Sequence, residues 1–181
     1  MRVLIDADGC PVTRAAVQIA ERFCVEALVF CDTSHEIQIP GAETIMVSKG
    51  ADSADFALLR MIKPGDAVVT QDYGLAALCL ARGAAAISQD GLRYTADNID
   101  ALLLSRHTSR KVRESGGRMK GPKKRLASQD AAFCAAFEAL ISELTPLEQK
   151  LKALPDWKGL FLEPARTYFS RAQPPKYLRR V

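Results

Sequence analysis

The stretch Val3-Leu4-Ile5-Asp6-Ala7-Asp8-Gly9-Cys10-Pro11 decides the expected fold. Its three leading apolar residues have the composition of a buried strand. Two carboxylates and a glycine follow, and then a proline suited to the first turn of a helix. In open α/β sheets, ligands bind outside the carboxyl ends of the strands, which is where Asp6 and Asp8 would lie. Two interpretations remain open: a divalent metal site that relieves the repulsion between the two carboxylates, or an ordinary turn with Asp8 as a capping acceptor.

Short strands and helices alternate along the chain after this stretch. Apolar residues recur with helical spacing from 12 to 23, and further helices are expected from 52 to 62, from 75 to 81, from about 95 and from 128. The short apolar runs at 27–31, 44–47, 67–70 and 84–87 are typical of strands. This alternation predicts an α/β fold with a mainly parallel sheet. We expect one domain over 1–144 and a Pro-containing C-terminal tail over 145–181.

Composition excludes several classes of protein. The chain has 181 residues, of which 48% are hydrophobic and 25% are charged, as in soluble globular domains. The apolar runs are too short to cross a bilayer, so we expect no membrane partner. Five widely spaced cysteines fit reduced thiols in the cytoplasm better than a disulfide framework. A homo-oligomer is compatible with the sequence, which leaves the oligomeric state open.

Positive charge is concentrated in one segment. Residues 105–125 contain nine lysines and arginines and one acidic residue, whereas the residues before them are acidic overall. Such a segment favours a polyanionic partner, above all nucleic acid bound through its phosphates. Glycines at 116, 117 and 121 predict a loop from Arg106 to Arg125, and a merely solvated charged loop is the alternative. The candidate phosphate-binding residues are Arg110, Lys111, Arg113, Arg118, Lys120, Lys123, Lys124 and Arg125.

Acidic residues recur at the places that such a fold would bring to one edge of the sheet. They are Asp6 with Asp8, Asp52 with Asp55, and Asp72. Clustered carboxylates without a nearby histidine favour Mg²⁺ or Mn²⁺ over zinc. The alternative for Asp52 and Asp55 is a pair that caps a helix and complements its dipole. For Asp72 the alternative is a simple turn residue.

The ordered motifs of the chain resemble those of the YaiI/YqxD family, bacterial proteins grouped with the PIN-like nucleases. The motifs are Asp6-Ala-Asp-Gly-Cys-Pro11, Gly50-Ala-Asp-Ser-Ala-Asp55, Thr70-Gln-Asp72, Tyr94-Thr-Ala-Asp-Asn-Ile99 and Arg113-Glu-Ser-Gly-Gly117. The resemblance covers about residues 1–142. It implies a PIN-like three-layer sandwich, with a mainly parallel central sheet flanked by helices, and an acidic metal-binding site. Matching positions of these motifs are Asp6, Asp8, Asp52, Asp55 and Asp72, together with Asp97 and Asn98, for which no role is implied.

The first hypothesis is a metal-dependent endoribonuclease-type hydrolase. Mg²⁺ or Mn²⁺ would be held by Asp6, Asp8, Asp55 and Asp72, with Asp52 in support, while the basic segment holds the RNA backbone and water is the nucleophile. One alternative is a phosphatase of the haloacid dehalogenase type, in which Asp6 is the nucleophile. The lysine and acidic pair that this alternative requires do not follow Thr70 in the proper order. Another alternative is a nucleic-acid-binding module without catalysis.

Overall fold

The computed structural model describes residues 1–33, 38–47, 53–114 and 124–146, and these residues form an α/β fold. A central sheet of six strands has the order β3-β2-β1-β4-β5-β6. Neighbouring strands are parallel, except for the pair of β5 and β6. The strands are β1 (Val3–Asp6), β2 (Ala27–Asp32), β3 (Glu43–Val47), β4 (Ala67–Val69), β5 (Ala85–Ile87) and β6 (Arg93–Tyr94).

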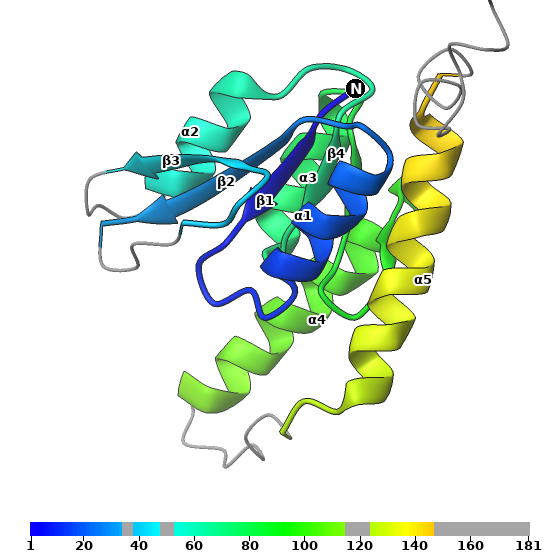
Figure 1. Cartoon of the computed structure of the whole chain (residues 1–181). Coiled ribbons are helices and arrows are strands. Elements are labelled where there is room, and N and C mark those ends of the chain that lie inside the picture. The colour runs from blue at the N-terminus through cyan, green and yellow to red at the C-terminus, as the bar shows by residue number, and fades with distance from the viewer. Residues whose placement is uncertain (34–37, 48–52, 115–123, 147–181) are drawn as a thin grey trace, which may run out of the picture.

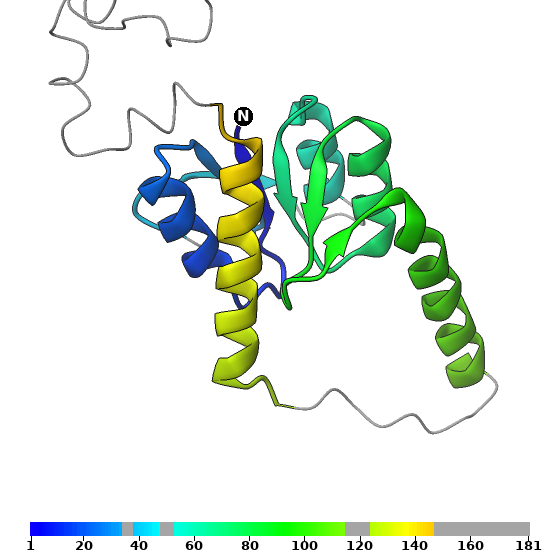
Figure 2. The ribbon, with the colours of Figure 1, turned by 90° about the vertical axis from the view of Figure 1, so that its right-hand side faces the viewer.

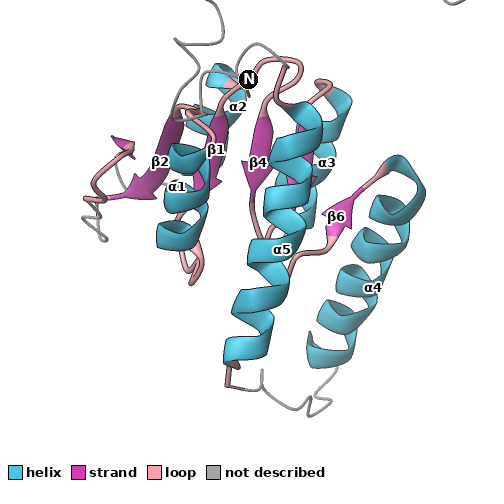
Figure 3. Ribbon diagram, turned by 45° about the vertical axis from the view of Figure 1, so that its right-hand side comes forward, coloured by secondary structure: helices cyan, strands magenta, loops and turns pink. Residues whose placement is uncertain are grey.

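Helices cover both faces of this sheet, which confirms the predicted three-layer α/β architecture (Figure 1). Figure 3 shows α1 and α5 in front of the sheet, and α2 and α3 behind it. The helix α4 packs against α3. The helices are α1 (Thr13–Arg22), α2 (Ser53–Met61), α3 (Tyr73–Ala81), α4 (Ala96–Glu114) and α5 (Ala127–Leu144).

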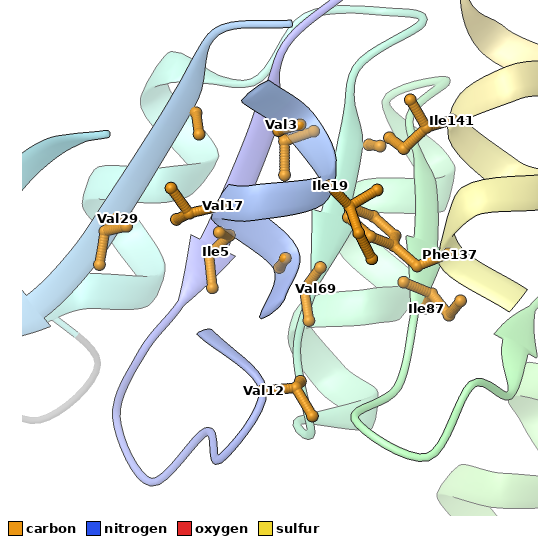
Figure 4. Close-up of a cluster of buried hydrophobic side chains, with 14 of the residues drawn as sticks. Val3, Ile5, Val12, Val17, Ile19, Val29, Val69, Ile87, Phe137 and Ile141 are labelled. Atoms are coloured by element: carbon orange, nitrogen blue, oxygen red, sulfur yellow. The ribbon is translucent and has the colours of Figure 1, made fainter. Parts of the chain in front are cut away.

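The alternation of side chains in β1 explains why its first three residues are all apolar. Val3 and Ile5 belong to the hydrophobic cluster that includes Phe137 of α5 (Figure 4). Leu4 belongs to a second cluster on the opposite face, with residues of α2 and α3. A strand that is buried on both faces must be apolar at every position, as parallel strands in three-layer folds are. Alternation places the next residue, Asp6, on the Leu4 face.

The order of the strands creates a topological switch point between β1 and β4. From β1 the chain continues through α1 to β2 on one side, whereas from β4 it continues through α3 to β5 on the other. The two connections therefore diverge at the carboxyl ends of two adjacent strands. Open α/β sheets bind ligands in the crevice at this position. The end of β1 carries Asp6, and Thr70 and Asp72 follow the end of β4.

A charged pair anchors the opposite, amino edge of the sheet. Asp66, only 3% exposed, accepts hydrogen bonds from the backbone N–H and Nη2 of Arg2 at 2.9 and 2.7 Å. The backbone N–H of Lys63 donates to the same carboxylate at 2.9 Å. Because its hydrogen bonds are all internal, the Asp66 carboxylate serves to join β1 to the turn before β4.

The structure corrects one local prediction and adds one strand that was not predicted. The helix α4 continues to Glu114, so the prediction of a loop that begins at Arg106 is wrong for residues 106–114. No glycine or proline interrupts this stretch, and arginine and lysine are good helix formers, so the run of charge is helical. The strand β6 was not predicted because two residues are too few to show a period. Residues 115–123 and the predicted tail from 147 onward lie outside the described residues.

Among the described residues, no helix combines the length and the apolar character that crossing a bilayer requires.

Candidate acidic site at the switch point

Asp6 lies at the end of β1 with a partly buried side chain. The hydroxyl of Thr70, a fully buried residue that follows β4, donates a 2.8 Å hydrogen bond to Asp6 Oδ2. Thr70 is itself held in place, because its backbone N–H donates to the carbonyl of Ile87 and its carbonyl accepts from the hydroxyl of Tyr94. The hydrogen bond between Asp6 and Thr70 therefore crosses the switch point of the sheet.

The surroundings of Asp6 make its ionisation unfavourable. Burial raises the pKa of Asp6 to about 6, and the negative charges of Asp55 and Asp8 add to this increase. The hydrogen bonds from Thr70 and from the backbone of Asp8 act in the opposite direction. A carboxylate that is partly desolvated and placed among other carboxylates is a candidate functional group, because structural carboxylates are more commonly stabilised by their neighbours.

The loop after β1 is tied to the strands on both of its sides. Asp8, which is exposed, accepts a 3.3 Å hydrogen bond from the backbone N–H of Asp32 at the end of β2. On the other side, Nε2 of Gln71 donates to the carbonyl of Gly9 at 2.6 Å. The helix α1 begins after Val12 without a side-chain cap, so the alternative interpretation of Asp8 as its cap is wrong. The conformation of this loop keeps Asp8 beside Asp6.

Asp55, in a later element of the chain, acts on the same site through its charge. It lies in the first turn of α2 with a partly buried side chain. Its charge raises the pKa of Asp6, and it adds to the increase that burial causes at the Cys79 thiol, whose pKa is about 12. The structure thus brings Asp6, Asp8 and Asp55 into one electrostatic group. Asp52 lies outside the described residues.

Asp72 is connected to Asp6 by hydrogen bonds through Thr70, but the carboxylate of Asp72 has partners of its own. It is the N-cap of α3, and its Oδ1 accepts from the backbone N–H groups of Gly74 and Leu75 at 2.7 and 3.1 Å. Its Oδ2 accepts from Nη1 of Arg106 at 2.5 Å. Burial favours a higher pKa for Asp72, but these hydrogen bonds outweigh it and lower the pKa below its usual value. The backbone N–H of Asp72 donates to Thr70 Oγ1 at 3.0 Å, which connects this cap to Asp6.

Carboxylate oxygens are the donors that Mg²⁺ and Mn²⁺ prefer, so the chemistry of the group suits a hard cation. Among the described residues, however, no three histidine, cysteine, aspartate or glutamate side chains come together as a ready-made metal site. Magnesium does not require such a cage. It commonly binds through one or two carboxylates and completes its shell with water and substrate phosphate.

The predicted basic residues divide into three kinds. Three of them, Arg110, Lys111 and Arg113, belong to α4, and their side chains are outside the described part. Three others, Arg118, Lys120 and Lys123, lie outside the described residues altogether. Lys124 is exposed. Arg125 is bound within the protein, donating to Asp90 at 2.7 Å, to Asp130 at 2.6 Å and to the carbonyl of Gln89 at 2.6 Å. Figure 2 shows that the ends of α4 and α5 next to this segment extend beyond the carboxyl ends of the strands.

Asn98, for which the sequence implied no role, holds the beginning of α4. Its Oδ1 accepts from the backbone N–H of Thr95 at 3.0 Å, and its Nδ2 donates to the carbonyl of Arg93 at 2.9 Å. This pair of hydrogen bonds fixes the turn between β6 and α4, and with it the direction in which α4 leaves the sheet. Arg106, which reaches Asp72 from α4, was not predicted as a site residue because nothing near it in the sequence marks that contact.

Comparison with known proteins agrees with the resemblance seen in the sequence. Residues 4–143 match the family model described as "Uncharacterized BCR, YaiI/YqxD family". A UPF0178 protein of Exiguobacterium sibiricum is 48% identical over 145 residues, which cover 80% of this chain and 99% of the relative. A UPF0178 protein of Clostridium acetobutylicum is 42% identical over 143 residues, or 78% of this chain and 97% of the relative.

No solved structure is significantly similar to the chain. The relation to PIN-like nucleases therefore stays a prediction. The match to the family model spans most of the chain and includes every acidic residue of the candidate site, and the relatives are aligned over almost their whole length. The chain belongs to the YaiI/YqxD family.

Proposed function

We propose that this protein is a nuclease that hydrolyses RNA phosphodiesters at the Asp6 site with the aid of Mg²⁺ or Mn²⁺. The observation that carries the proposal is the raised pKa of Asp6, a partly buried carboxyl at the switch point with Asp8 and Asp55 as neighbours. A partly buried carboxylate beside two other carboxylates is a candidate site for a cation, because a cation relieves the repulsion between the like charges. The segment 105–125, with nine basic residues, supports a polyanionic substrate.

The cation would bind through one or two of the carboxylates of Asp6, Asp8 and Asp55, with water and substrate phosphate as its other ligands. Both carboxylate oxygens of Asp72 already accept hydrogen bonds, so we assign to Asp72 the role of fixing α3 and Arg106. Asp52, the supporting residue of the first hypothesis, keeps that role in the proposal. When bound, Mg²⁺ or Mn²⁺ supplies Lewis-acid stabilisation of the charge that develops on the phosphodiester as water attacks it.

The protein's own residues supply position and charge. Thr70 fixes the rotamer of Asp6 by donating to Oδ2, and it stabilises the ionised carboxylate that a cation requires. Because the pKa of Asp6 is about 6, the carboxyl is mainly ionised at pH 7 and becomes protonated in mild acid. A proton therefore competes with the cation for this carboxylate, and the affinity for Mg²⁺ or Mn²⁺ should decline as the pH falls through 6.

The test is a cleavage assay with single-stranded RNA and single-stranded DNA in the presence of Mn²⁺. Asp6→Asn should reduce cleavage on the order of a hundredfold, because it removes a charged ligand and leaves the shape of the side chain. Asp100→Asn is the matched control, because Asp100 is an exposed carboxylate on α4. Equal cleavage by the parent protein and by Asp6→Asn would contradict the proposal, and so would the absence of cleavage with either metal.

A second candidate uses Asp6 as a nucleophile toward a phosphate ester. The hydrogen bond from Thr70 favours it, because this contact aims a carboxylate at a fixed point at the end of the strand. The carboxylate oxygen would attack phosphorus, form an aspartyl-phosphate and release the alcohol, and water would then release phosphate. Rapid quenching followed by mass spectrometry distinguishes the candidates, since only this reaction adds a phosphoryl group to Asp6. Binding of RNA without turnover would instead favour the non-catalytic module.

A further inference from the structure

Arg106 is held from two directions beside the acidic site. Its Nη1 donates a 2.5 Å hydrogen bond to Asp72 Oδ2, and its side chain remains 53% exposed. The guanidinium carbon lies 5.9 Å from the centre of the Tyr73 ring. The Tyr73 ring in turn packs edge-on against Tyr94, with the ring centres 5.9 Å apart. The cation is therefore placed by a carboxylate and an aromatic ring, both of which are fixed to the start of α3.

A continuous series of hydrogen bonds joins this cation to Asp6. Thr70 Oγ1 donates to Asp6 and accepts from the backbone N–H of Asp72, and the carboxylate of Asp72 accepts from Arg106. Asp6 and Arg106 are thus separated by two residues in one network. A substrate phosphate at the acidic site would consequently have a positioned cation at its side.

The hydrogen-bonding capacity of Arg106 exceeds what the described part of the protein uses. A guanidinium has five N–H donors in a planar fork, and within the described residues the contact with Asp72 is its one hydrogen bond. Exposed ion pairs of this kind contribute little to the stability of a fold. The unused donors suit the oxygens of a phosphate, for which the planar fork of arginine is well matched.

The helix continues the positive charge away from the site. Arg106, Arg110 and Arg113 have the spacing i, i+4 and i+7, which places the three positions on one face of α4. Arg113 lies about 10 Å further along the helix axis than Arg106. A strand of nucleic acid that follows this face would begin beside Asp72 and run along α4 past the positions of Arg110 and Arg113.

We propose that Arg106 binds a backbone phosphate of single-stranded RNA next to the acidic site, with Asp72 and Tyr73 as its positioning residues. This inference rests on the proposed function for its class of substrate, and it adds a residue that is absent from the motifs and from the candidate phosphate-binding residues of the basic segment. Because Asp72 and Tyr73 already restrict the side chain of Arg106, less conformational entropy is lost when it binds a phosphate.

The experiment measures binding of a fluorescein-labelled single-stranded RNA oligonucleotide by anisotropy, in EDTA, over a range of salt concentrations. For Arg106→Gln we expect the Kd to rise about tenfold, because a charge-assisted hydrogen bond is lost. The slope of log K against log salt should also decrease in magnitude by about 0.7, the value for one phosphate contact on a single strand. Arg22→Gln is the matched control, because Arg22 is an exposed arginine that pairs with Glu138 at the end of α1. It should change neither quantity.

Two further variants separate binding from positioning. Arg106→Lys keeps the charge and loses the planar fork, so it should preserve the salt slope while weakening binding. Asp72→Asn keeps an N-cap residue but removes the charge that holds Arg106, so the Kd should rise without a change in slope. Circular dichroism and the Tm of each variant confirm that the fold is intact.

The outcomes distinguish this inference from the proposed function. If Arg106→Gln binds RNA as Arg22→Gln does, or loses affinity with an unchanged salt slope, Arg106 does not contact phosphate and the inference is wrong. The proposed function then still stands if the parent cleaves RNA and Asp6→Asn does not. If instead the slope changes as expected and no variant cleaves RNA, the inference holds for a binding site and the nuclease is rejected. A parent protein that binds no RNA overturns both.

Discussion

The hydroxyl of Thr70 and the carboxylate of Asp6, 64 residues apart in the sequence, form a 2.8 Å hydrogen bond where β1 and β4 end side by side. This contact determines how the candidate site is charged. Thr70 stabilises the ionised form of Asp6, whereas burial and the carboxylates of Asp55 and Asp8 oppose ionisation. The balance leaves the pKa of Asp6 at about 6, above its usual value.

Replacement of Thr70 by valine should raise the pKa of Asp6 above its present value of about 6. The substitution keeps the shape of the side chain and removes the donor that favours the carboxylate. It also leaves the backbone N–H of Asp72 without its acceptor, so stability should fall by about 1–3 kcal/mol. The pKa is measured by carbon-detected NMR titration of the Asp6 carboxyl. In Thr70→Ser, which retains a hydroxyl, the pKa of Asp6 should equal that in the parent protein. An unchanged pKa in Thr70→Val would show that the hydrogen bond has no influence.

Asp6→Asn should stabilise the protein at neutral pH in the absence of metal. The folded-state pKa of Asp6, about 6, exceeds the usual value of 3.8, so folding takes up a proton between these two values. Stability contributed by the protonated carboxyl is complete below about pH 4 and is lost as the pH rises through 6. An uncharged amide avoids this loss, so the variant should gain about 2–3 kcal/mol at pH 7.5 and little at pH 4.

Urea unfolding in EDTA at both pH values measures this difference. Asp100→Asn, at an exposed position of α4, should leave stability within about 0.5 kcal/mol at either pH. A variant at Asp6 that is destabilised at pH 7.5 would mean that the carboxylate is stabilised by its surroundings, which would remove the main support for a cation site.

The framework of the fold could be predicted from sequence because the signals that specify it are local. The apolar run in β1, the helical spacing in α1 and the apolar stripe of α5 each reflect burial. Burial favours an apolar side chain at each position independently of distant contacts. Phe133 and Phe137 of α5 are fully buried as that stripe predicted. The position of Asp6 followed from the same logic, since the end of a central parallel strand lies at the ligand-binding edge.

The contacts that give the site its chemistry had no local signal. Thr70 reaches Asp6 across 64 residues, and Arg106 reaches Asp72 across 34. The position of Asp72 after a strand predicts a metal ligand. The same position is also that of a helix N-cap, and only the placement of α3 and Arg106 shows that both oxygens are used. Arg106 looked like the start of a loop because a run of charge resembles a solvated segment.

Arg125 and Lys124 should have opposite effects when each is changed to glutamine. Arg125 joins Asp90, Asp130 and the carbonyl of Gln89, so Arg125→Gln should lower the Tm by several degrees, as the loss of about 1 kcal/mol or more does in a domain of this size. Lys124 is exposed, so Lys124→Gln should leave the Tm unchanged and weaken RNA binding, with a smaller salt slope. Thermal unfolding and anisotropy measure the two effects. Loss of RNA binding without loss of stability in Arg125→Gln would instead assign this residue to the RNA-binding surface.

Gly91 and Gly65 should respond very differently to replacement by alanine, although both have a positive φ, of +84° and +81°. At Gly65 no atom lies within 4 Å of an added Cβ, so Gly65→Ala should cost about 1–2 kcal/mol, the energy of the left-handed conformation alone. At Gly91 the added Cβ would lie 3.0 Å from the carbonyl oxygen of Ala132 and 3.1 Å from Cβ of Ala136. Both atoms belong to the rigid helix α5, so Gly91→Ala should cost more than Gly65→Ala, because α5 or the turn before β6 must move. Urea unfolding of the two variants measures the difference, and equal losses would show that α5 yields easily at this contact.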